Sequence, residues 1–141
     1  MPTLPDLRLA ALALAPAALV ACAAMTAMPE PEEGAALFAE NCAVCHGPGG
    51  RGGGPLAEDL RPAPPDLTRI AARAGGSFPR VEVLSTIDGY TRGDKAQGPD
   101  MPEFGRLLRG ETVPVDTGDG VMSPVPRPLA ALLVYLESIQ R

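Results

Sequence analysis

Two cysteines and the only histidine of the chain lie together in the sequence CAVCH at residues 42–46. The pattern C-x-x-C-H is typical of covalent attachment of a c-type haem. Each thiol would add across one vinyl group of the porphyrin to form a thioether, and two intervening residues give the reach that one porphyrin edge requires. The motif therefore predicts one covalent haem c, held by Cys42 and Cys45, with His46 as an iron ligand.

Two other kinds of site use cysteines at this spacing. A redox-active C-x-x-C disulfide usually follows a strand and opens a helix in a βαβ unit, and the sequence around residues 42–46 shows no such pattern. A structural zinc site requires four nitrogen or sulfur ligands. Cys42, Cys45 and His46 supply three, and the neighbouring sequence offers no fourth. Haem attachment is the interpretation that we favour.

The composition indicates one small domain with too few large apolar side chains to form a stable core by itself. The chain has 141 residues and a net charge of −5, a length typical of one domain. The acidic balance argues against nucleic-acid binding, which needs Lys and Arg to neutralise phosphates. With 17 prolines, 16 glycines, no Trp, three Phe and two Tyr, the chain is rich in turn formers and poor in large apolar side chains. A bound haem would supply the missing apolar bulk.

The first segment is typical of an export signal. An apolar run at residues 9–20 leads into the sequence LVAC at residues 19–22, which resembles the lipobox of bacterial lipoproteins. In that family the signal is cut before the Cys, and the sulfur, here that of Cys22, carries diacylglycerol. We therefore expect a signal peptide at residues 1–21, a tether at 22–31 and a cytochrome domain at 32–141.

Two alternatives for this segment stay open. Cleavage after Ala24 or Ala27 would give a soluble periplasmic protein. Residues 9–28 are almost wholly apolar and have about the length of a transmembrane helix, although Pro16 disfavours a helix there. Each alternative places the remaining chain outside the cytoplasm. We expect the lipid-anchored form, on the periplasmic side of a bacterial membrane.

Short helical patterns follow, separated by stretches rich in proline and glycine, and none requires a large sheet. Two acids in the first turn suit the positive end of the first helix, and Asp66 is placed as an N-cap. Residues 111–126 place Val113, Val115 and Val121 around a Gly-Asp-Gly turn, a pattern compatible with a small hairpin. We expect helices at residues 32–41, 67–74, 79–88, 102–109 and 128–140.

Three stretches resemble the small monohaem c-type cytochromes of class I. They are GAALF at residues 34–38, MPEF at residues 101–104 and LLVYL at residues 132–136. The resemblance implies an all-α cytochrome c fold in which four to five helices surround one covalent haem. It also implies that the first and last helices cross at a glycine, beside an aromatic pair. The matching residues are Gly34, Phe38 and Tyr135.

The resemblance also implies the second iron ligand and a partner for the first. In the family the second ligand is a Met on a loop, typically followed by Pro, which points to Met101, with Met122 as its rival. A thioether is a soft, neutral ligand that favours Fe(II) and raises the reduction potential. Gly54-Pro55-Leu56 resembles the segment whose Pro carbonyl accepts the Nδ1–H of the ligand His, which points to Pro55.

Apolar and cationic side chains should surround the haem. The apolar candidates are Leu56, Leu60, Leu67, Val83, Leu84 and Ile87. The candidate partners of the propionates are Arg51, Arg61, Arg80 and Arg92.

We expect an electron carrier rather than an enzyme, because two permanent ligands would leave the iron no open position for a substrate. The expected partners are redox proteins, such as a membrane dehydrogenase, oxidase or reductase, met by a monomer or complex subunit on its lipid anchor. One alternative is a dedicated haem c subunit of a larger dehydrogenase or terminal oxidase, with residues 111–126 as a partner-binding insertion. Another is an open iron that binds peroxide or a gas.

Overall fold

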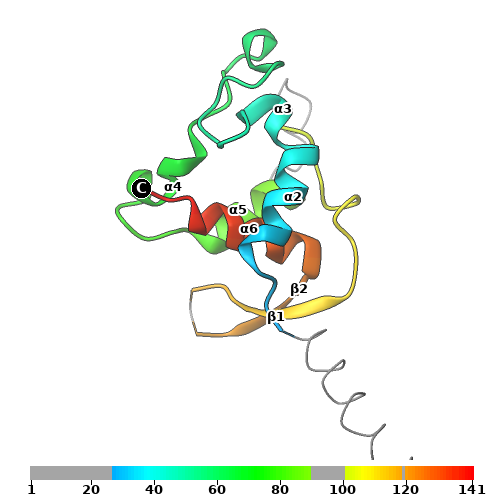
Figure 1. Ribbon diagram of the computed structural model, residues 1–141. Helices are drawn as coiled ribbons and strands as arrows, with labels where there is room; N and C mark the ends of the chain where they lie inside the picture. Colours follow the sequence, from blue (N-terminus) through cyan, green and yellow to red (C-terminus); the bar gives the residue numbers. More distant parts are fainter. Residues whose placement is uncertain (1–26, 90–100, 119) are drawn as a thin grey trace, which may run out of the picture.

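The computed structural model describes residues 27–89, 101–118 and 120–141, and it is mostly helical with one β-hairpin (Figure 1). The hairpin and α3 lie at opposite ends of the domain, with the crossing of α2 and α6 between them. The elements are α2 (Pro31–Asn41), α3 (Ala43–His46), η1 (Ala57–Asp59), η2 (Leu67–Arg69), α4 (Ile70–Arg73), α5 (Arg80–Asp88), β1 (Thr112–Asp116), β2 (Met122–Pro126) and α6 (Arg127–Ser138).

The first and last of these helices, α2 and α6, pack against each other at Gly34, as the sequence predicts. A Cβ at Gly34 would overlap the backbone carbonyl of Ala131 and come within 2.6 Å of the Cβ of Tyr135. One helical turn further along α2, the ring of Phe38 packs against that of Tyr135, with centroids 5.1 Å apart and planes tilted by 50°. Both helices begin with Pro in the first turn, where its missing N–H costs no hydrogen bond.

The segment after the glycine-rich loop forms two very short helices, η2 and α4. The carboxylate of Asp66 accepts a hydrogen bond from the backbone N–H of Thr68 at 2.9 Å, which confirms the expected N-cap. The next helix, α5, ends at Gly89 in the left-handed conformation, which glycine adopts without steric cost. The expected helices at 67–74 and 79–88 are therefore present, the first of them broken into a 3-10 turn and one α-helical turn.

The fold is not entirely α-helical, because residues 112–126 form a two-stranded antiparallel hairpin. Val113 pairs with Val125, and Pro114 with Pro124. Alternate residues of β1 face the core, so that Val113 and Val115 are 1 % exposed. Prolines in both strands lack the N–H that a further strand would need. The hairpin therefore adds a sheet of two strands to the helical core, and the expectation of an all-α fold is corrected to this extent.

The helix expected at residues 102–109 is absent, and a single turn takes its place. The backbone N–H of Phe104 donates to the carbonyl of Ile87, and that of Gly105 to the carbonyl of Asp88. These donors therefore bond to the end of α5 and do not start a helix of their own. Only the N–H groups of Leu107 and Leu108 return to the carbonyl of Phe104.

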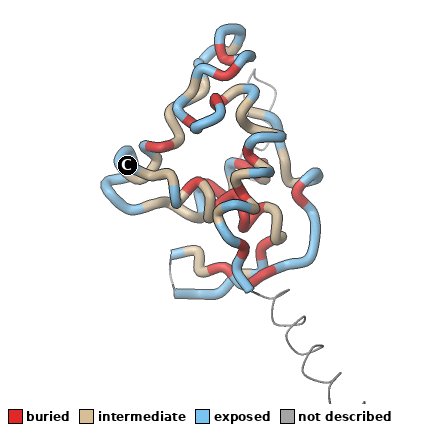
Figure 2. The backbone as a smooth tube through the Cα atoms, in the orientation of Figure 1, coloured by how far each residue is buried: buried red, intermediate tan, exposed pale blue. Residues whose placement is uncertain are grey.

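Buried side chains concentrate where α2, α5 and α6 meet, and the hairpin adds its inward valines to the same core (Figure 2). No helix in the described part of the chain has both the length and the apolar character needed to cross a membrane. The predicted signal peptide, Cys22 and the first half of the tether lie outside the described residues.

Candidate functional site

A cavity of about 350 Å³ opens between the α2–α3 junction, the segment from Pro65 to Ile87, and α6. This volume lies within the range of about 300–1,000 Å³ that is usual for small-molecule and cofactor sites. Most of its walls are apolar. The lining residues are Phe38, Cys42, His46, Pro65, Leu67, Ile70, Arg73, Ala74, Pro79, Glu82, Val83, Thr86, Ile87, Met101, Leu132 and Leu136.

The C-x-x-C-H motif occupies the junction of α2 and α3. The backbone N–H of Cys42 donates to the carbonyl of Phe38 at 2.9 Å and so continues the hydrogen bonding of α2, while Cys45 and His46 lie on the single turn of α3. Cys42 and His46 line the cavity, whereas Cys45 is half-buried beside it and is not among the lining residues. Both thiols are free, and no disulfide joins them.

The glycine-rich loop after the motif holds the motif in place through backbone hydrogen bonds. Gly52 N–H donates to the carbonyl of His46 at 2.8 Å, and Gly54 N–H to the carbonyl of Cys45 at 3.2 Å. A Cβ at Gly54 would lie 2.5 Å from the carbonyl oxygens of Ala43 and Val44. Gly54 is therefore required so that the loop can approach the backbone of α3 this closely.

His46 is buried, with 7 % of its surface exposed, and is suited to binding a metal as a neutral imidazole. Burial in the apolar cavity wall lowers the pKa of His46, because desolvation disfavours the charged ring, and this outweighs the opposite effect of the Pro65 backbone. Nδ1 of His46 is buried and makes no hydrogen bond of good geometry, alone among the buried polar side-chain atoms of the described residues. The contact with Pro65 is therefore loose.

The proline whose backbone contacts the imidazole is Pro65 and not Pro55, the residue that the resemblance pointed to. Pro55 is exposed in the turn before η1 and does not line the cavity. Pro65 lines the cavity and contacts His46 because the chain returns past the motif between η1 and η2.

The free thiol of Cys42 is held in its protonated form. Burial, assisted by the neighbouring Cys45, raises the pKa of Cys42 to about 11. A thiol in an apolar wall of this kind is a poor metal ligand and a poor disulfide nucleophile at neutral pH. The described residues contain no group of three or more His, Cys, Asp and Glu side chains able to hold a metal ion. Neither the zinc site nor the disulfide chemistry gains support.

The two candidate methionines lie in different places. Met101 lines the same cavity as Cys42 and His46 and packs partly buried against the core. Met122 lies on β2, is 56 % exposed and is absent from this cavity. The residues before Met101, at positions 98–100, lie outside the described part of the chain.

Of the expected apolar cover, Leu67, Val83 and Ile87 line the cavity. Leu84 is buried in the core instead, and Leu56 is exposed.

Among the arginines of the described residues, the one that lines the cavity is Arg73, which the sequence did not single out. Arg61 donates to the carbonyls of Glu58 and Leu60. Arg80 pairs with Glu137 at 3.0 Å. Arg51 is exposed and is absent from the cavity lining, and Arg92 lies outside the described residues.

The donor set, the orphaned Nδ1 and the apolar walls of this cavity fit a haem attached at the motif. A comparison with protein families supports the same conclusion, since the family model for cytochrome c matches residues 31–112. No curated protein and no solved structure matched the chain in the corresponding searches. The family binds haem c covalently through a Cys pair, and Cys42 and Cys45 lie within the matched residues. The chain therefore belongs to the cytochrome c family and binds haem c through Cys42 and Cys45.

Proposed function

We propose that this protein is an electron carrier with one haem c, whose iron is bound by His46 and Met101. The observation that carries the proposal is that Met101 and His46 line one cavity, which Cys42 also lines. When bound, the haem supplies an iron that cycles between Fe(III) and Fe(II). With both axial positions filled by side chains, no position is left for a substrate, which favours a carrier over an enzyme.

The surrounding residues are suited to a high reduction potential. A thioether ligand favours Fe(II), and an apolar environment disfavours the more highly charged ferric centre. Leu67, Val83 and Leu132 line the cavity with apolar side chains, which would limit the access of water to the haem. The buried His46 stays neutral and keeps its lone pair available to a metal.

Spectra of two methionine variants test the axial ligation. The ferric protein should show the weak far-red charge-transfer band of a methionine–iron bond. We expect Met101→Ala to abolish this band and to lower the reduction potential, and Met122→Ala to change neither. Loss of the band in Met122→Ala alone would contradict the assignment. Ready binding of CO or cyanide by the unmodified protein would favour an open iron instead.

We further propose that the mature protein is anchored at the periplasmic side of a bacterial membrane by diacylglycerol on Cys22, after removal of residues 1–21. The supporting observation is the lipobox-like sequence at residues 19–22. The intact mass of the mature protein tests this, because lipidation and cleavage before Cys22 each change the mass by a known amount. A mass that begins after Ala24 or Ala27 without lipid would instead indicate a soluble periplasmic protein, and an uncleaved mass would indicate a transmembrane anchor.

A second candidate function is that of a dedicated haem c subunit in a larger dehydrogenase or terminal oxidase. The hairpin favours it, because Val121 and Met122 present apolar surface, 59 % and 56 % exposed, away from the haem cavity. A free carrier should purify alone and meet its redox partners only transiently. Purification in a stoichiometric complex from native membranes, released by substitutions at Val121 and Met122, would favour the subunit role.

A further inference from the structure

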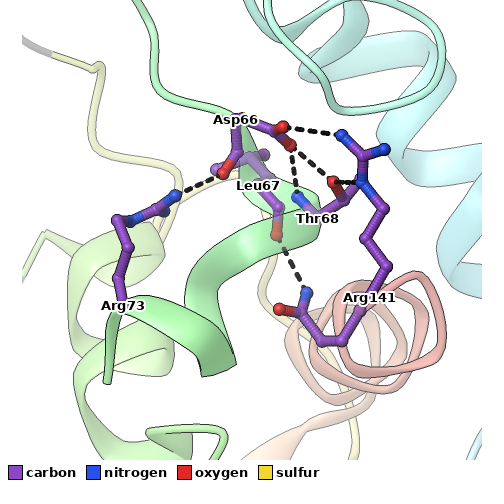
Figure 3. A network of polar contacts seen from close by, with 6 residues as sticks. Asp66, Leu67, Thr68, Arg73 and Arg141 are labelled. Carbon is purple, nitrogen blue, oxygen red and sulfur yellow. Dashed lines mark hydrogen bonds and ion pairs between the residues drawn. The ribbon is translucent and has the colours of Figure 1, made fainter. Parts of the chain in front are cut away.

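Gln140 and Arg141 follow α6 and its C-cap residue, Ile139. Both are hydrogen-bonded to the segment that contains η2 (Figure 3). The guanidinium of Arg141 donates to Thr68 Oγ1 at 2.8 Å and to Asp66 Oδ2 at 3.0 Å. Its backbone N–H donates to the carbonyl of Thr68 at 3.0 Å. The side chain of Gln140 donates to the carbonyl of Leu67 at 2.8 Å and accepts from the N–H of Ala71 at 2.9 Å.

The bound segment is one wall of the haem cavity. Pro65, Leu67, Ile70, Arg73 and Ala74 all line it. The helices in this wall have three and four residues, which is too short for a stable helix in water. The wall therefore depends on contacts with the rest of the domain.

Nearly all hydrogen bonds from this wall to other elements of the described chain go to Gln140 and Arg141. The exception is the N–H of Leu67, which donates to the carbonyl of Gly50 at 2.7 Å. Arg73 bonds to the carbonyl of Asp66, within the segment itself. Because α6 also lines the cavity through Leu132 and Leu136, the two residues after it connect one wall of the cavity to another.

We propose that Gln140 and Arg141 are positioning residues that hold the Pro65–Ala74 wall against the haem, and so exclude water from it and keep the Pro65 carbonyl beside His46. This inference rests on the proposed function, because the haem is what the wall covers. Arg141 is 52 % exposed, so its ion pair with Asp66 adds little to global stability. Its effect should appear locally, in the wall and at the iron.

The test compares variants of the haem-loaded protein. The double variant Gln140→Ala/Arg141→Ala removes the connection, and Arg127→Ala serves as the matched control. Arg127 forms a comparable ion pair between α6 and α2, with Glu33 at 2.9 Å, away from the cavity. A milder variant, Gln140→Glu, keeps the acceptor for the N–H of Ala71 and loses the donor to Leu67.

We expect the double variant to exchange the amide hydrogens of residues 68–74 roughly tenfold faster than the wild type. Its reduction potential should fall, because water that reaches the haem stabilises Fe(III). Gln140→Glu should shift the exchange rate and the reduction potential in the same directions but by less. Arg127→Ala should change neither quantity. Wild-type exchange and potential in the double variant, or equal changes in Arg127→Ala, would overturn this inference alone. A wild-type protein without haem would overturn the proposed function as well.

Discussion

The backbone carbonyl of Ala131 occupies the space that a side chain at Gly34 would need. This contact fixes the crossing of α2 and α6, and both helices contribute side chains to the haem cavity, Phe38 from α2 and Leu132 from α6. The crossing therefore couples the packing of these two helices to the shape of the site.

Gly34→Ala should lower the free energy of unfolding of the haem-loaded protein by about 2 kcal/mol or more. Inserting an extra methyl group into a packed core costs about 1–3 kcal/mol, and the backbone carbonyl of Ala131, unlike a side chain, cannot rotate out of the way. Gly49→Ala is the control, because a Cβ there meets nothing within 4 Å. Chemical denaturation followed by visible absorbance measures both. Equal midpoints for the two variants would contradict the crossing.

Removal of the haem should leave the domain largely unfolded. The wall of η2 and α4 has three- and four-residue helices, and the apolar cavity of about 350 Å³ would lose the group that fills it. Protein made with Cys42→Ser and Cys45→Ser in cells that cannot attach haem should show little chemical-shift dispersion and no cooperative thermal transition. A well-dispersed spectrum would show instead that the core made by α2, α6 and the hairpin is sufficient.

The hairpin should contribute to stability as part of the core. Val113 is 1 % exposed and Val121 is 59 % exposed, on the same hairpin. Truncation of a buried aliphatic side chain costs about 1–3 kcal/mol, whereas exposed substitutions usually stay within about 0.5 kcal/mol. Val113→Ala should therefore lower the free energy of unfolding by that larger amount and Val121→Ala should not. If neither variant is destabilised, the hairpin is an independent appendage.

The Asp66 carboxylate should make stability depend on acid pH. The hydroxyl of Thr68, followed by its backbone N–H and by Arg141, holds the pKa of Asp66 below its ordinary value. Because the folded pKa is the lower one, the stabilisation is complete above the ordinary pKa and is lost as the pH falls through the folded pKa. Asp66→Asn, which keeps a capping side chain, removes this dependence.

The measurement is the difference in unfolding free energy between wild type and Asp66→Asn at a series of pH values. The wild type should be the more stable protein above about pH 5, and the difference should shrink as the pH falls below about 4, where the carboxyl of Asp66 in the unfolded chain begins to bind a proton. A difference that stays constant down to pH 3 would mean that the contacts of Asp66 do not favour its ionised form.

The helices and the haem motif could be predicted from the sequence because their signals are local. Asp66, for example, caps η2, whereas the crossing of α2 and α6 at Gly34 is implied by the family resemblance. Contacts between distant residues could not be predicted in this way. Whether Pro55 or Pro65 approaches His46 depends on the path of the intervening loop, and the helix expected at residues 102–109 is lost to hydrogen bonds with α5.

The contact between Arg141 and the cavity wall is the least predictable of these distant contacts. Arg141 and Asp66 are 75 residues apart in the chain, and the N-cap pattern at Asp66 does not indicate that Arg141 binds it. Arg73, on α4 of the same wall, lines the cavity as well. Such roles follow from the folded arrangement and have no local signature in the sequence.

The central claim is that one haem is bound covalently to Cys42 and Cys45 of this chain. It is tested most directly by the intact mass and visible spectrum of the denatured protein, produced in cells with a complete haem-attachment system. We predict a red protein whose mass exceeds that of the mature polypeptide, with any lipid accounted for, by one haem that denaturant does not release. Cys42→Ser/Cys45→Ser should lack this added mass. A colourless wild-type protein with no haem in its mass would contradict the account.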